Sequence, residues 1–394
     1  MTKKKLLFVN GHLNVGGVEK SLADLLSNLD YHKYDVDLLL LEDKGTYLQQ
    51  IPKEVNIIFF NTTKAYGPLL KSIFLNLFKF RWSMIWYRII LLIANKLGKT
   101  YLSLLRYILS LKSIYDVAIA YRPGICADIV AYIVKSKKKI VWWHHGEINI
   151  SLSEINEYNK TWYLFDNIVT VSNACKKMLE QTFNNHSNKI IVIPNMIDII
   201  QIVKKAGNMS PYNKNTRIKF VSVGRLCTEK HFEDTINVVT QLLNDEIKDF
   251  HWYIIGDGNL RKKLETLIKE HCVGNYITLL GKKNNPYPWI KYADIYVHPS
   301  YVESQGLAIL EAMTLNTPCV VCRSAGSSEF VIDGVNAIMT EPNPISLYNG
   351  VLKMIKSKDR YSFAVEARKM VENRFSSQCI VELLDKQIAT YEIK

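Results

Sequence analysis

Two glutamates, eight positions apart, are the residues of this sequence best suited to act on one ligand. Glu303 lies in a turn after an apolar run that ends at Pro299, and Glu311 lies in the strongly helix-forming segment 307–315. A helix rises about 1.5 Å per residue, so we expect about 12 Å between the two along its axis, comparable with the length of a nucleotide-sugar. One carboxylate could hold the sugar and the other the ribose.

The turn between the apolar run and the helix could also hold a phosphate. Backbone N–H groups at a helix start lack partners and lie at the positive end of the helix dipole. The turn carries Ser304 and Gly306, and Leu307 opens the helix, so a diphosphate could lie between the two carboxylates. The alternative is that Glu303 and Glu311 bind no ligand and are ordinary polar residues, one at a helix cap and one on a helix face. For any two glutamates taken alone, this alternative is the commoner one.

Two cations bracket a second turn between a strand and a helix. Arg225 and Lys230 follow the predicted strand 219–223. This pair suits a diphosphate, because arginine forms planar bidentate bonds and lysine supplies a point charge. Composition alone would favour solvated surface charges at these positions.

A glycine turn follows the first predicted strand, 6–9, and precedes a helical pattern. Gly16 and Gly17 in this turn would let a ligand approach the backbone. The turn does not have the Gly-x-Gly-x-x-Gly pattern of dinucleotide-binding proteins. An ordinary tight turn explains the two glycines equally well.

Two adjacent histidines follow the predicted strand 140–142. His144 and His145 therefore lie at the carboxyl end of a strand, where open parallel sheets bind ligands. Adjacent side chains point in different directions, so we expect at most one of the two to face a cleft. A histidine hydrogen-bonded within a loop is the alternative. The remaining histidines lack the spacing of metal ligands, and we predict no metal site.

Together these motifs resemble the family 4 glycosyltransferases. The main feature is Glu-x7-Glu, placed after a strand that ends in Pro-Ser and ending in Glu-Ala-Met. Gly-Arg-Leu with a lysine five residues after the arginine also matches the family, as do Gly-Gly-Val-Glu at 16–19, Val-Ser-x-Ala at 171–174 and Pro-Asn-x-Ile-Asp at 194–198. One departure is His231, where the family usually has glycine. The resemblance covers essentially the whole chain and is weakest from 55 to 115.

The resemblance implies an α/β fold of two facing Rossmann-like domains, the GT-B architecture, with a cleft between them. Residues 1–200 would form the acceptor-side domain and 201–375 the nucleotide-sugar-binding domain. Residues 376–394 would form a helix that crosses back to the first domain. Strands and helices alternate along the chain, which predicts parallel sheets, and the polar, basic segment 201–217 is interpreted as the linker.

The resemblance also implies the reaction. The protein would transfer a sugar from a nucleotide diphosphate donor to an acceptor hydroxyl, with retention at the anomeric carbon. We expect a UDP-sugar, bound as a substrate, and neither cofactor nor metal. The catalytic residues implied are Glu303, His145, Arg225 and Lys230. Donor contacts are implied for Gly16, Gly17, Arg225, Lys230, Lys283, Glu303, Ser304, Gly306, Leu307 and Glu311. Retention through a covalent glycosyl carboxylate and front-face attack both remain open.

The composition is globular and strongly basic. Hydrophobic residues make up 48% of the chain and the formal net charge is +13, which points to an anionic partner. Seven scattered cysteines, an odd number, indicate reduced thiols and a cytosolic location. The N-terminus has only a short apolar run and is expected to form a strand instead of a signal peptide.

Residues 55–115 contain no Asp or Glu, and basic and aromatic residues are interleaved through 64–112. No apolar stretch there approaches the roughly 18 residues of a spanning helix. We therefore expect this segment to bind an anionic membrane surface, and the protein to be cytoplasmic and peripheral on the inner face of the cell membrane. The acceptor would be a glycan on a polyprenyl-type lipid carrier, as in capsule or lipopolysaccharide synthesis. Core helices with a solvated basic face are the alternative; no nucleic-acid-binding motif accompanies the charge.

Three other functions compete with this interpretation. A nucleotide-dependent oxidoreductase would need the dinucleotide fingerprint that is absent. A nucleotide-sugar epimerase of the same architecture would form product without an acceptor. A non-catalytic membrane-surface protein would explain the basic segment but would not need Glu303.

Overall fold

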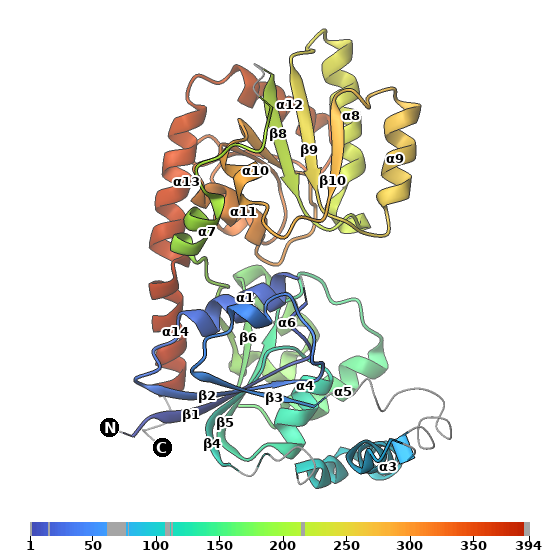
Figure 1. The fold of residues 1–394 in the computed structure, drawn as a ribbon, viewed down its shortest axis with the longest axis vertical. Helices are drawn as coiled ribbons and strands as arrows, with labels where there is room; N and C mark the ends of the chain where they lie inside the picture. The colour runs from blue at the N-terminus through green and yellow to red at the C-terminus, as the bar shows by residue number, and fades with distance from the viewer. Residues whose placement is uncertain are drawn as a thin grey trace.

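The computed structural model describes residues 2–14, 16–60, 76–77, 79–106, 111, 113–213 and 217–389. They form two α/β units stacked along the long axis of the molecule (Figure 1). The first unit is built on a 7-stranded sheet of order β3-β2-β1-β4-β5-β6-β7. Its strands are β1 (Lys4–Asn10), β2 (Tyr34–Leu40), β3 (Val55–Phe59), β4 (Tyr115–Ala120), β5 (Ser136–Trp143), β6 (Asn167–Thr170) and β7 (Ile190–Val192).

The second unit is built on a 6-stranded sheet of order β10-β9-β8-β11-β12-β13. Its strands are β8 (Ile218–Val223), β9 (Phe250–Ile255), β10 (Ile277–Gly281), β11 (Ile295–His298), β12 (Cys319–Cys322) and β13 (Ile338–Thr340). All strand pairs in both sheets are parallel. This confirms the predicted α/β class.

Helices cover both faces of the first sheet, which is why its central strands are apolar on both sides. In β1, Leu7 and Val9 belong to one hydrophobic cluster and Leu6 and Phe8 to the other, as the two-residue period of a strand requires. The helices of this unit are α1 (Gly17–Ser27), α3 (Trp82–Leu97), α4 (Ile125–Asp128), α5 (Leu152–Trp162) and α6 (Asn173–Thr182).

The second sheet is covered in the same way. In β8, Phe220 packs into one cluster and Val221 into the other. The helices of this unit are α7 (Ile199–Ala206), α8 (Phe232–Asn244), α9 (Arg261–Glu270), α10 (Tyr287–Lys291), α11 (Leu307–Thr314), α12 (Pro344–Lys356) and α13 (Arg360–Phe375).

The interpretation of 201–217 as a linker is wrong for its first residues. Residues 199–206 form α7, which begins where the Asp198 carboxylate accepts a hydrogen bond from the Gln201 N–H at 2.9 Å. Ile202 and Ala206 are buried in the core of the second unit. Lys204 is exposed on the outer face of this helix together with Ile200 and Val203. Most of the polar residues that suggested a linker follow the helix, from Gly207 onward.

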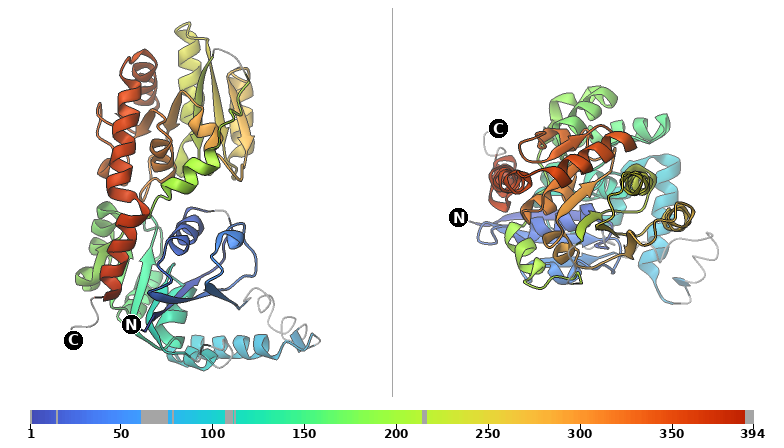
Figure 2. Two further views of the ribbon diagram at one scale, coloured as in Figure 1. Left: turned by 60° about the vertical axis from the view of Figure 1, so that its left-hand side comes forward. Right: turned by 90° about the horizontal axis from the view of Figure 1, so that it is seen from above.

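The chain passes between the units at two neighbouring places. Ile197 donates its N–H to the Phe375 carbonyl at 2.8 Å and forms a parallel bridge with Ser376. From there α14 (Ser377–Ala389) continues α13 and runs back along the first unit (Figures 1 and 2). The Asp385 carboxylate of α14 accepts a hydrogen bond from the Tyr34 hydroxyl at 2.8 Å.

Helix α3 lies at the end of the first unit that faces away from the second unit (Figures 1 and 2). Met84, Tyr87 and Ile90 on its inner face are buried. Large apolar side chains on its outer face are exposed, among them Trp82 and Trp86, at 56% and 57%. Residues 61–75, 78, 107–110 and 112 of the predicted membrane segment lie outside the described residues. Within the described chain, no helix is both long and apolar enough to cross a bilayer.

Substitutions of two neighbouring leucines on α14, Leu384 and Leu383, test whether this helix stabilises the first unit. Leu384 is fully buried in the core of the first sheet, whereas Leu383 is 37% exposed. We expect Leu384→Ala to lower the free energy of unfolding by about 2–5 kcal/mol and Leu383→Ala by less than about 1 kcal/mol. Denaturant unfolding of both variants measures the difference, and equal losses would contradict the packing described.

Candidate active site

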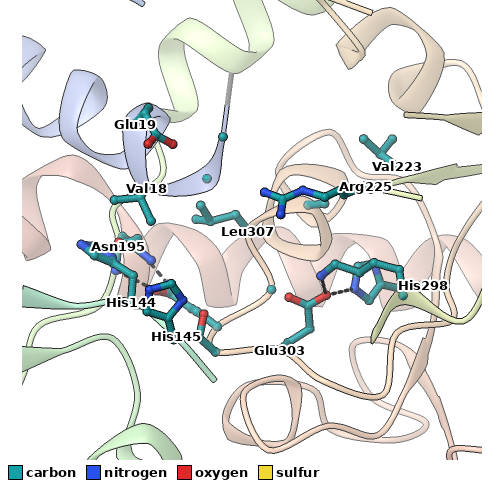
Figure 3. A pocket seen from close by; sticks show the side chains of 18 of the residues that line it. Val18, Glu19, His144, His145, Asn195, Val223, Arg225, His298, Glu303 and Leu307 are labelled. Carbon is teal, nitrogen blue, oxygen red and sulfur yellow. Dashed lines mark hydrogen bonds and ion pairs between the residues drawn. The ribbon is translucent and has the colours of Figure 1, made fainter. Parts of the chain in front are cut away.

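The two units meet across a cavity of about 420 Å³. It lies at the carboxyl ends of β1, β4 and β5 in the first sheet and of β8 and β11 in the second, where parallel sheets bind ligands. Figure 3 shows Glu19 and His145 on the first unit's side, with Arg225 and Glu303 on the second unit's side. Most of the predicted site lines this cavity: Gly16, Gly17, His145, Arg225, Lys230, Glu303, Ser304, Gly306 and Leu307.

Glu303 is held by two donors that share one of its oxygens. The Lys230 ammonium and the His298 Nε2 both contact Glu303 Oε1, the histidine at 2.6 Å. Burial by itself would raise the pKa of Glu303, but Lys230 and His298 outweigh burial and lower that pKa to about 2. Glu303 is therefore ionised throughout the physiological range.

A buried tyrosine continues this chain of side chains. The Tyr296 hydroxyl lies 3.0 Å from His298 Nδ1, and both residues are on β11. The hydroxyl can donate to Nδ1 while Nε2–H donates to Glu303, which fixes the plane of the imidazole. His298 was not predicted from the sequence, although its place at the end of a strand directly before Pro299 was a usable signal.

Backbone contacts fix the turn that carries Glu303. The Gly326 N–H donates to the Glu303 carbonyl at 3.1 Å, and a Cβ at Gly326 would lie only 2.6 Å from that oxygen. Gly306 has a φ of 85°, a conformation that favours glycine, and it caps the start of α11. The first N–H groups of α11, at Leu307 and Ala308, have no intrahelical acceptor and lie at the cavity wall.

The turn after β8 brings Arg225 and Lys230 to the same wall. His231, where the family usually has glycine, adopts a left-handed conformation with φ of 47°. Its ring stacks on Tyr301 with centroids 3.6 Å apart. The turn therefore keeps the backbone conformation that favours glycine, and the two cations stay in place.

The first unit contributes a buried acidic residue to the opposite wall. Glu19 at the start of α1 is 2% exposed. It forms an ion pair with Arg122, which lies two residues after the end of β4. A Cβ at Gly16 would lie 2.2 Å from a Glu19 oxygen, and one at Gly17 would lie 3.6 Å from Leu307 of the second unit. The glycine loop thus brings its backbone close to the Glu19 side chain and to Leu307. No role was predicted for Arg122 from the sequence.

Both adjacent histidines line the cavity, so the expectation that at most one faces a cleft is wrong. They follow the end of β5, where the chain turns along the cavity instead of continuing as a strand. His145 is exposed, whereas His144 is 7% exposed. Partial desolvation of the ring by the cavity walls and, to a lesser degree, the Arg122 guanidinium lower the pKa of His145.

Direct contacts hold the units together around the cavity. The Gln305 side chain accepts from the Asn195 N–H at 2.7 Å and donates to the Asn195 carbonyl at 3.0 Å. The Glu329 carboxylate caps the start of α6, accepting from the Ala174 N–H at 2.6 Å. A Cβ at Gly146 would lie 2.9 Å from the backbone of the Glu303 turn. Sequence spacing gave no signal for these long-range pairs.

Two predicted donor contacts lie away from the cavity lining. Glu311 is 6% exposed; it accepts from the Tyr287 hydroxyl at 3.2 Å and lies 3.3 Å from the Lys20 ammonium of the first unit. Burial raises the pKa of Glu311, and Lys20 offsets this only in part. Lys283 is exposed in the loop after β10. The interpretation of both as donor contacts stays a prediction.

The ion pair at Glu303 makes the free energy of unfolding depend on pH. Because the folded-state pKa of about 2 lies below the ordinary value of 4.5, Glu303 stabilises the fold above pH 4.5 and loses this contribution as the pH falls through 2. We expect Glu303→Gln to lower the free energy of unfolding by about 3 kcal/mol at neutral pH.

Denaturant unfolding at pH 7, 5 and 3 checks this prediction. The difference from the unsubstituted protein should stay constant between pH 7 and 5 and shrink at pH 3. Glu270→Gln, at an exposed position at the end of α9, is the control and should change stability by less than about 0.5 kcal/mol. A difference that grows as the pH falls would contradict the assignment.

Comparison with solved structures shows the same architecture. HepE from Anabaena, crystallised with UDP-glucose, superposes with a TM-score of 0.71 at 18% identity, covering 98% of this chain and 99% of that one. TarM from S. aureus, in a complex that contains UDP, superposes with a TM-score of 0.74 at 14% identity, covering 98% of this chain and 100% of that one. The fold is therefore GT-B.

Curated relatives carry related names. The UDP-Gal:alpha-D-GlcNAc-diphosphoundecaprenol alpha-1,3-galactosyltransferase of Escherichia coli is 28% identical over 208 residues, 50% of this chain and 52% of the relative. The alpha-monoglucosyldiacylglycerol synthase of Acholeplasma laidlawii is 26% identical over 208 residues, 50% of this chain and 49% of the relative. The chain thus spans about half the length of these curated relatives.

Two family models match successive parts of the chain. The model described as Glycosyltransferase Family 4 matches residues 15–201, and the model described as Glycosyl transferases group 1 matches residues 205–373. Together they cover both units and the cavity between them. The chain belongs to the family 4 type of glycosyltransferases, with the GT-B fold.

Proposed function

We propose that the protein transfers a sugar from a nucleotide diphosphate donor, a UDP-sugar, to an acceptor hydroxyl with retention at the anomeric carbon. The observation that carries this proposal is the convergence of Arg225, Lys230, Glu303 and the start of α11 on one cavity between the units. These groups supply two cations and free backbone donors for a diphosphate, beside a carboxylate for sugar hydroxyls. The UDP and UDP-glucose complexes of HepE support the donor class.

The cations would act mainly on the leaving group. As the bond to the sugar breaks, negative charge grows on the diphosphate, and donors fixed in advance stabilise it without reorganising. Arg225 can bind two phosphate oxygens, Lys230 supplies a compact charge, and the N–H groups at Leu307 and Ala308 point from the helix start. No metal is needed for this step.

Glu303 would orient the sugar instead of attacking it. One of its oxygens is already engaged by Lys230 and His298, and a carboxylate whose pKa is near 2 is a weak nucleophile. We therefore favour front-face attack, in which the acceptor hydroxyl approaches from the side of the departing phosphate and passes its proton to that phosphate. His145 would face the sugar from the first unit.

Closure of the units would keep water away from the donor. Gln305 and Asn195 bind each other across the cavity edge, and Gly146 approaches the Glu303 turn without room for a Cβ. A cavity closed in this way strengthens the electrostatic contacts within it and disfavours hydrolysis.

Nucleotide protection against thermal unfolding tests the donor site. A ligand that binds only the folded protein raises its melting temperature, and we expect UDP to do so. Arg225→Ala should weaken UDP binding by about 10- to 100-fold because a charge-assisted bidentate contact is lost. Lys262→Ala, which removes an exposed cation of α9, should leave UDP binding unchanged.

Two outcomes would overturn the proposed function. Equal protection of Arg225→Ala and the unsubstituted protein would place the diphosphate elsewhere. Conversion of the donor to an epimer without any acceptor would favour the epimerase alternative. The assay for the second outcome is product analysis with a UDP-hexose as the sole substrate.

We also propose that the acceptor is a lipid-linked glycan and that the protein works at the inner face of the cell membrane. The support is the exposed apolar surface formed by Phe80, just before α3, and by Trp82, Trp86 and Leu97 of α3. These four side chains are 81%, 56%, 57% and 66% exposed. The surrounding segment 55–115 contains basic residues but no acidic ones. Aromatic side chains beside cations suit the interface of an anionic bilayer.

Flotation with lipid vesicles tests the membrane proposal. The protein should bind vesicles that contain phosphatidylglycerol and bind pure phosphatidylcholine vesicles less. The double substitution Trp82→Ser and Trp86→Ser should reduce binding by at least about tenfold, because two aromatic side chains that would enter the bilayer interface are lost. Ile345→Ser, at a 74% exposed position on α12, is the control. Unchanged binding of the double variant would contradict the proposal.

A further inference from the structure

The cavity joins two crevices of the same kind, and the proposed donor uses only one of them. In the second sheet, β9 and β10 lie on one side of β8, whereas β11 lies on the other side. Open parallel sheets bind ligands at the carboxyl ends of the two strands where the strand order reverses in this way. Arg225 and Lys230 follow β8 and Glu303 follows β11. The proposed donor site therefore lies at the reversal point of the second sheet.

The first sheet has its own reversal point, between β1 and β4. Strands β2 and β3 lie on one side of β1, and β4 lies on the other side. Glu19 follows β1 and Arg122 follows β4, and both residues line the cavity. Among the described residues of the first unit that line it, Arg122 is the only arginine or lysine. The proposed reaction gives neither Glu19 nor Arg122 a role.

The backbone around Arg122 is fixed on both sides. The Tyr121 N–H donates to the Val9 carbonyl at 2.9 Å, which continues the pairing of β4 with β1, and the Tyr121 side chain is buried. Pro123 has a restricted φ, and Gly124, directly before α4, has a φ of 72°. The sequence thus places the arginine in a short turn of defined conformation at the cavity wall.

Glu19 holds one edge of the Arg122 guanidinium. Glu19 Oε1 accepts a hydrogen bond from Arg122 Nη2 and lies 3.4 Å from His12 Nδ1. The glycine loop covers the other carboxylate oxygen, since a Cβ at Gly16 would lie 2.2 Å from it. The Glu19 side chain is 3% exposed and the Arg122 side chain is 33% exposed. A ligand in the cavity could therefore contact Arg122, whereas Glu19 is almost fully covered.

The guanidinium has more donors than partners. It carries five N–H groups, and Glu19 is its only hydrogen-bond partner among the described residues. Arg122 Nε is buried and has no partner within that part of the chain. Native proteins pair nearly all buried polar groups, so an incompletely paired arginine at a cavity wall calls for an explanation beyond packing. Desolvation and, to a lesser degree, the Arg122 charge lower the pKa of His145, which places the guanidinium near that histidine.

The charges of the two crevices suit different ligands. In the first crevice, Glu19 balances the charge of Arg122. In the second, Arg225 and Lys230 bring two positive charges to a wall that carries the single carboxylate of Glu303. An anionic diphosphate is favoured at the second crevice. A planar fork of N–H donors with a balanced charge suits a neutral ligand that offers two neighbouring oxygens, as the hydroxyls of a sugar ring do.

We propose that Arg122 binds the acceptor, donating its N–H groups to oxygens of the acceptor sugar beside the hydroxyl that reacts. This inference rests on the proposed function, in which the donor occupies the second crevice and leaves the first to the acceptor. Arg122 is thus a specificity residue for the acceptor. Glu19 is a positioning residue that acts through it.

The test separates acceptor binding from donor binding. Arg122→Gln removes the charge and the planar fork, and Arg122→Lys keeps the charge without the fork. Glu19→Gln keeps a hydrogen-bond acceptor for Arg122 and removes the balancing charge. Lys137→Gln, which removes the cation of an ion pair with Asp116 near the amino ends of β4 and β5, is the control.

The acceptor probes are octyl glycosides of glucose, galactose, mannose and N-acetylglucosamine, their deoxy analogues, and glucose 1-phosphate as an anionic sugar. The donors are UDP-glucose, UDP-galactose and UDP-N-acetylglucosamine. Protection against thermal unfolding measures binding of UDP, and of each acceptor probe in the presence of UDP. Product analysis with the donor that is used gives the acceptor KM.

We expect at least one octyl glycoside to protect the UDP-bound protein and to act as an acceptor. Its KM should rise by at least about tenfold in Arg122→Gln and Arg122→Lys, because the paired contacts of the fork are lost. UDP binding should stay within about twofold in both. One deoxy analogue should bind the unsubstituted protein about tenfold more weakly than its parent and bind Arg122→Gln equally well. Glu19→Gln should raise the acceptor KM by a smaller factor, and Lys137→Gln should leave it unchanged.

An unchanged acceptor KM in both Arg122 variants would overturn the inference. Equal losses of UDP binding and acceptor binding would also overturn it, because the ion pair would then serve only the structure of the wall. Failure of every octyl glycoside to bind the unsubstituted protein would count against a neutral sugar as the ligand, with or without binding of glucose 1-phosphate. Should Arg122→Gln not fold, Arg122→Lys and the deoxy series decide.

Failure of the proposed function gives a different result. The unsubstituted protein would then show neither UDP protection nor transfer, and both proposals would fall. If only the assignment of Arg122 is wrong, UDP protection and transfer persist and the acceptor KM does not respond to its substitution.

Discussion

The site depends on a single carboxylate oxygen that is shared by an ammonium and an imidazole. Glu303 is ionised because Lys230 and His298 compensate its burial. The three side chains come from the turn after β8, the end of β11 and the turn before α11, so this contact fixes the relative positions of three loops. Without it, the second unit would have a buried charge and no defined wall for a ligand.

The opposite wall has a different character. It consists of a glycine loop, a buried ion pair and aromatic rings around His144, and its polar groups mostly pair within the first unit. Some contacts between the units are uncharged, as between Gln305 and Asn195. Others use a carboxylate of the second unit, as where Glu329 caps α6 and where Glu311 lies beside Lys20. The wall with Arg225 and Lys230 therefore faces a wall whose ion pair, between Glu19 and Arg122, balances its own charge. The anionic donor that we propose would be attracted to the first of these walls.

Local patterns predicted the parts of the site that depend on neighbouring residues. The strand-turn-helix signals around Arg225 and Glu303 identified two loops that do meet at the cavity. Partners that are distant in the chain could not be predicted from the sequence: Glu311 contacts Lys20 of the first unit, and Glu329 caps a helix of that unit. Sequence reasoning also failed for α7, because the polar residues that follow this mostly apolar helix suggested that the linker begins earlier than it does. It failed for the two histidines because alternation does not hold beyond the end of a strand.

The neighbouring crossings at Ile197 and Ser376 limit how the halves can move. Because both covalent connections lie along one edge and are bonded to each other, they act as a single hinge line. Sliding one half sideways over the other would shear that bridge, whereas swinging about it would not. A hinge motion of this kind would open the cavity most on the side opposite the hinge, and substrates would enter there.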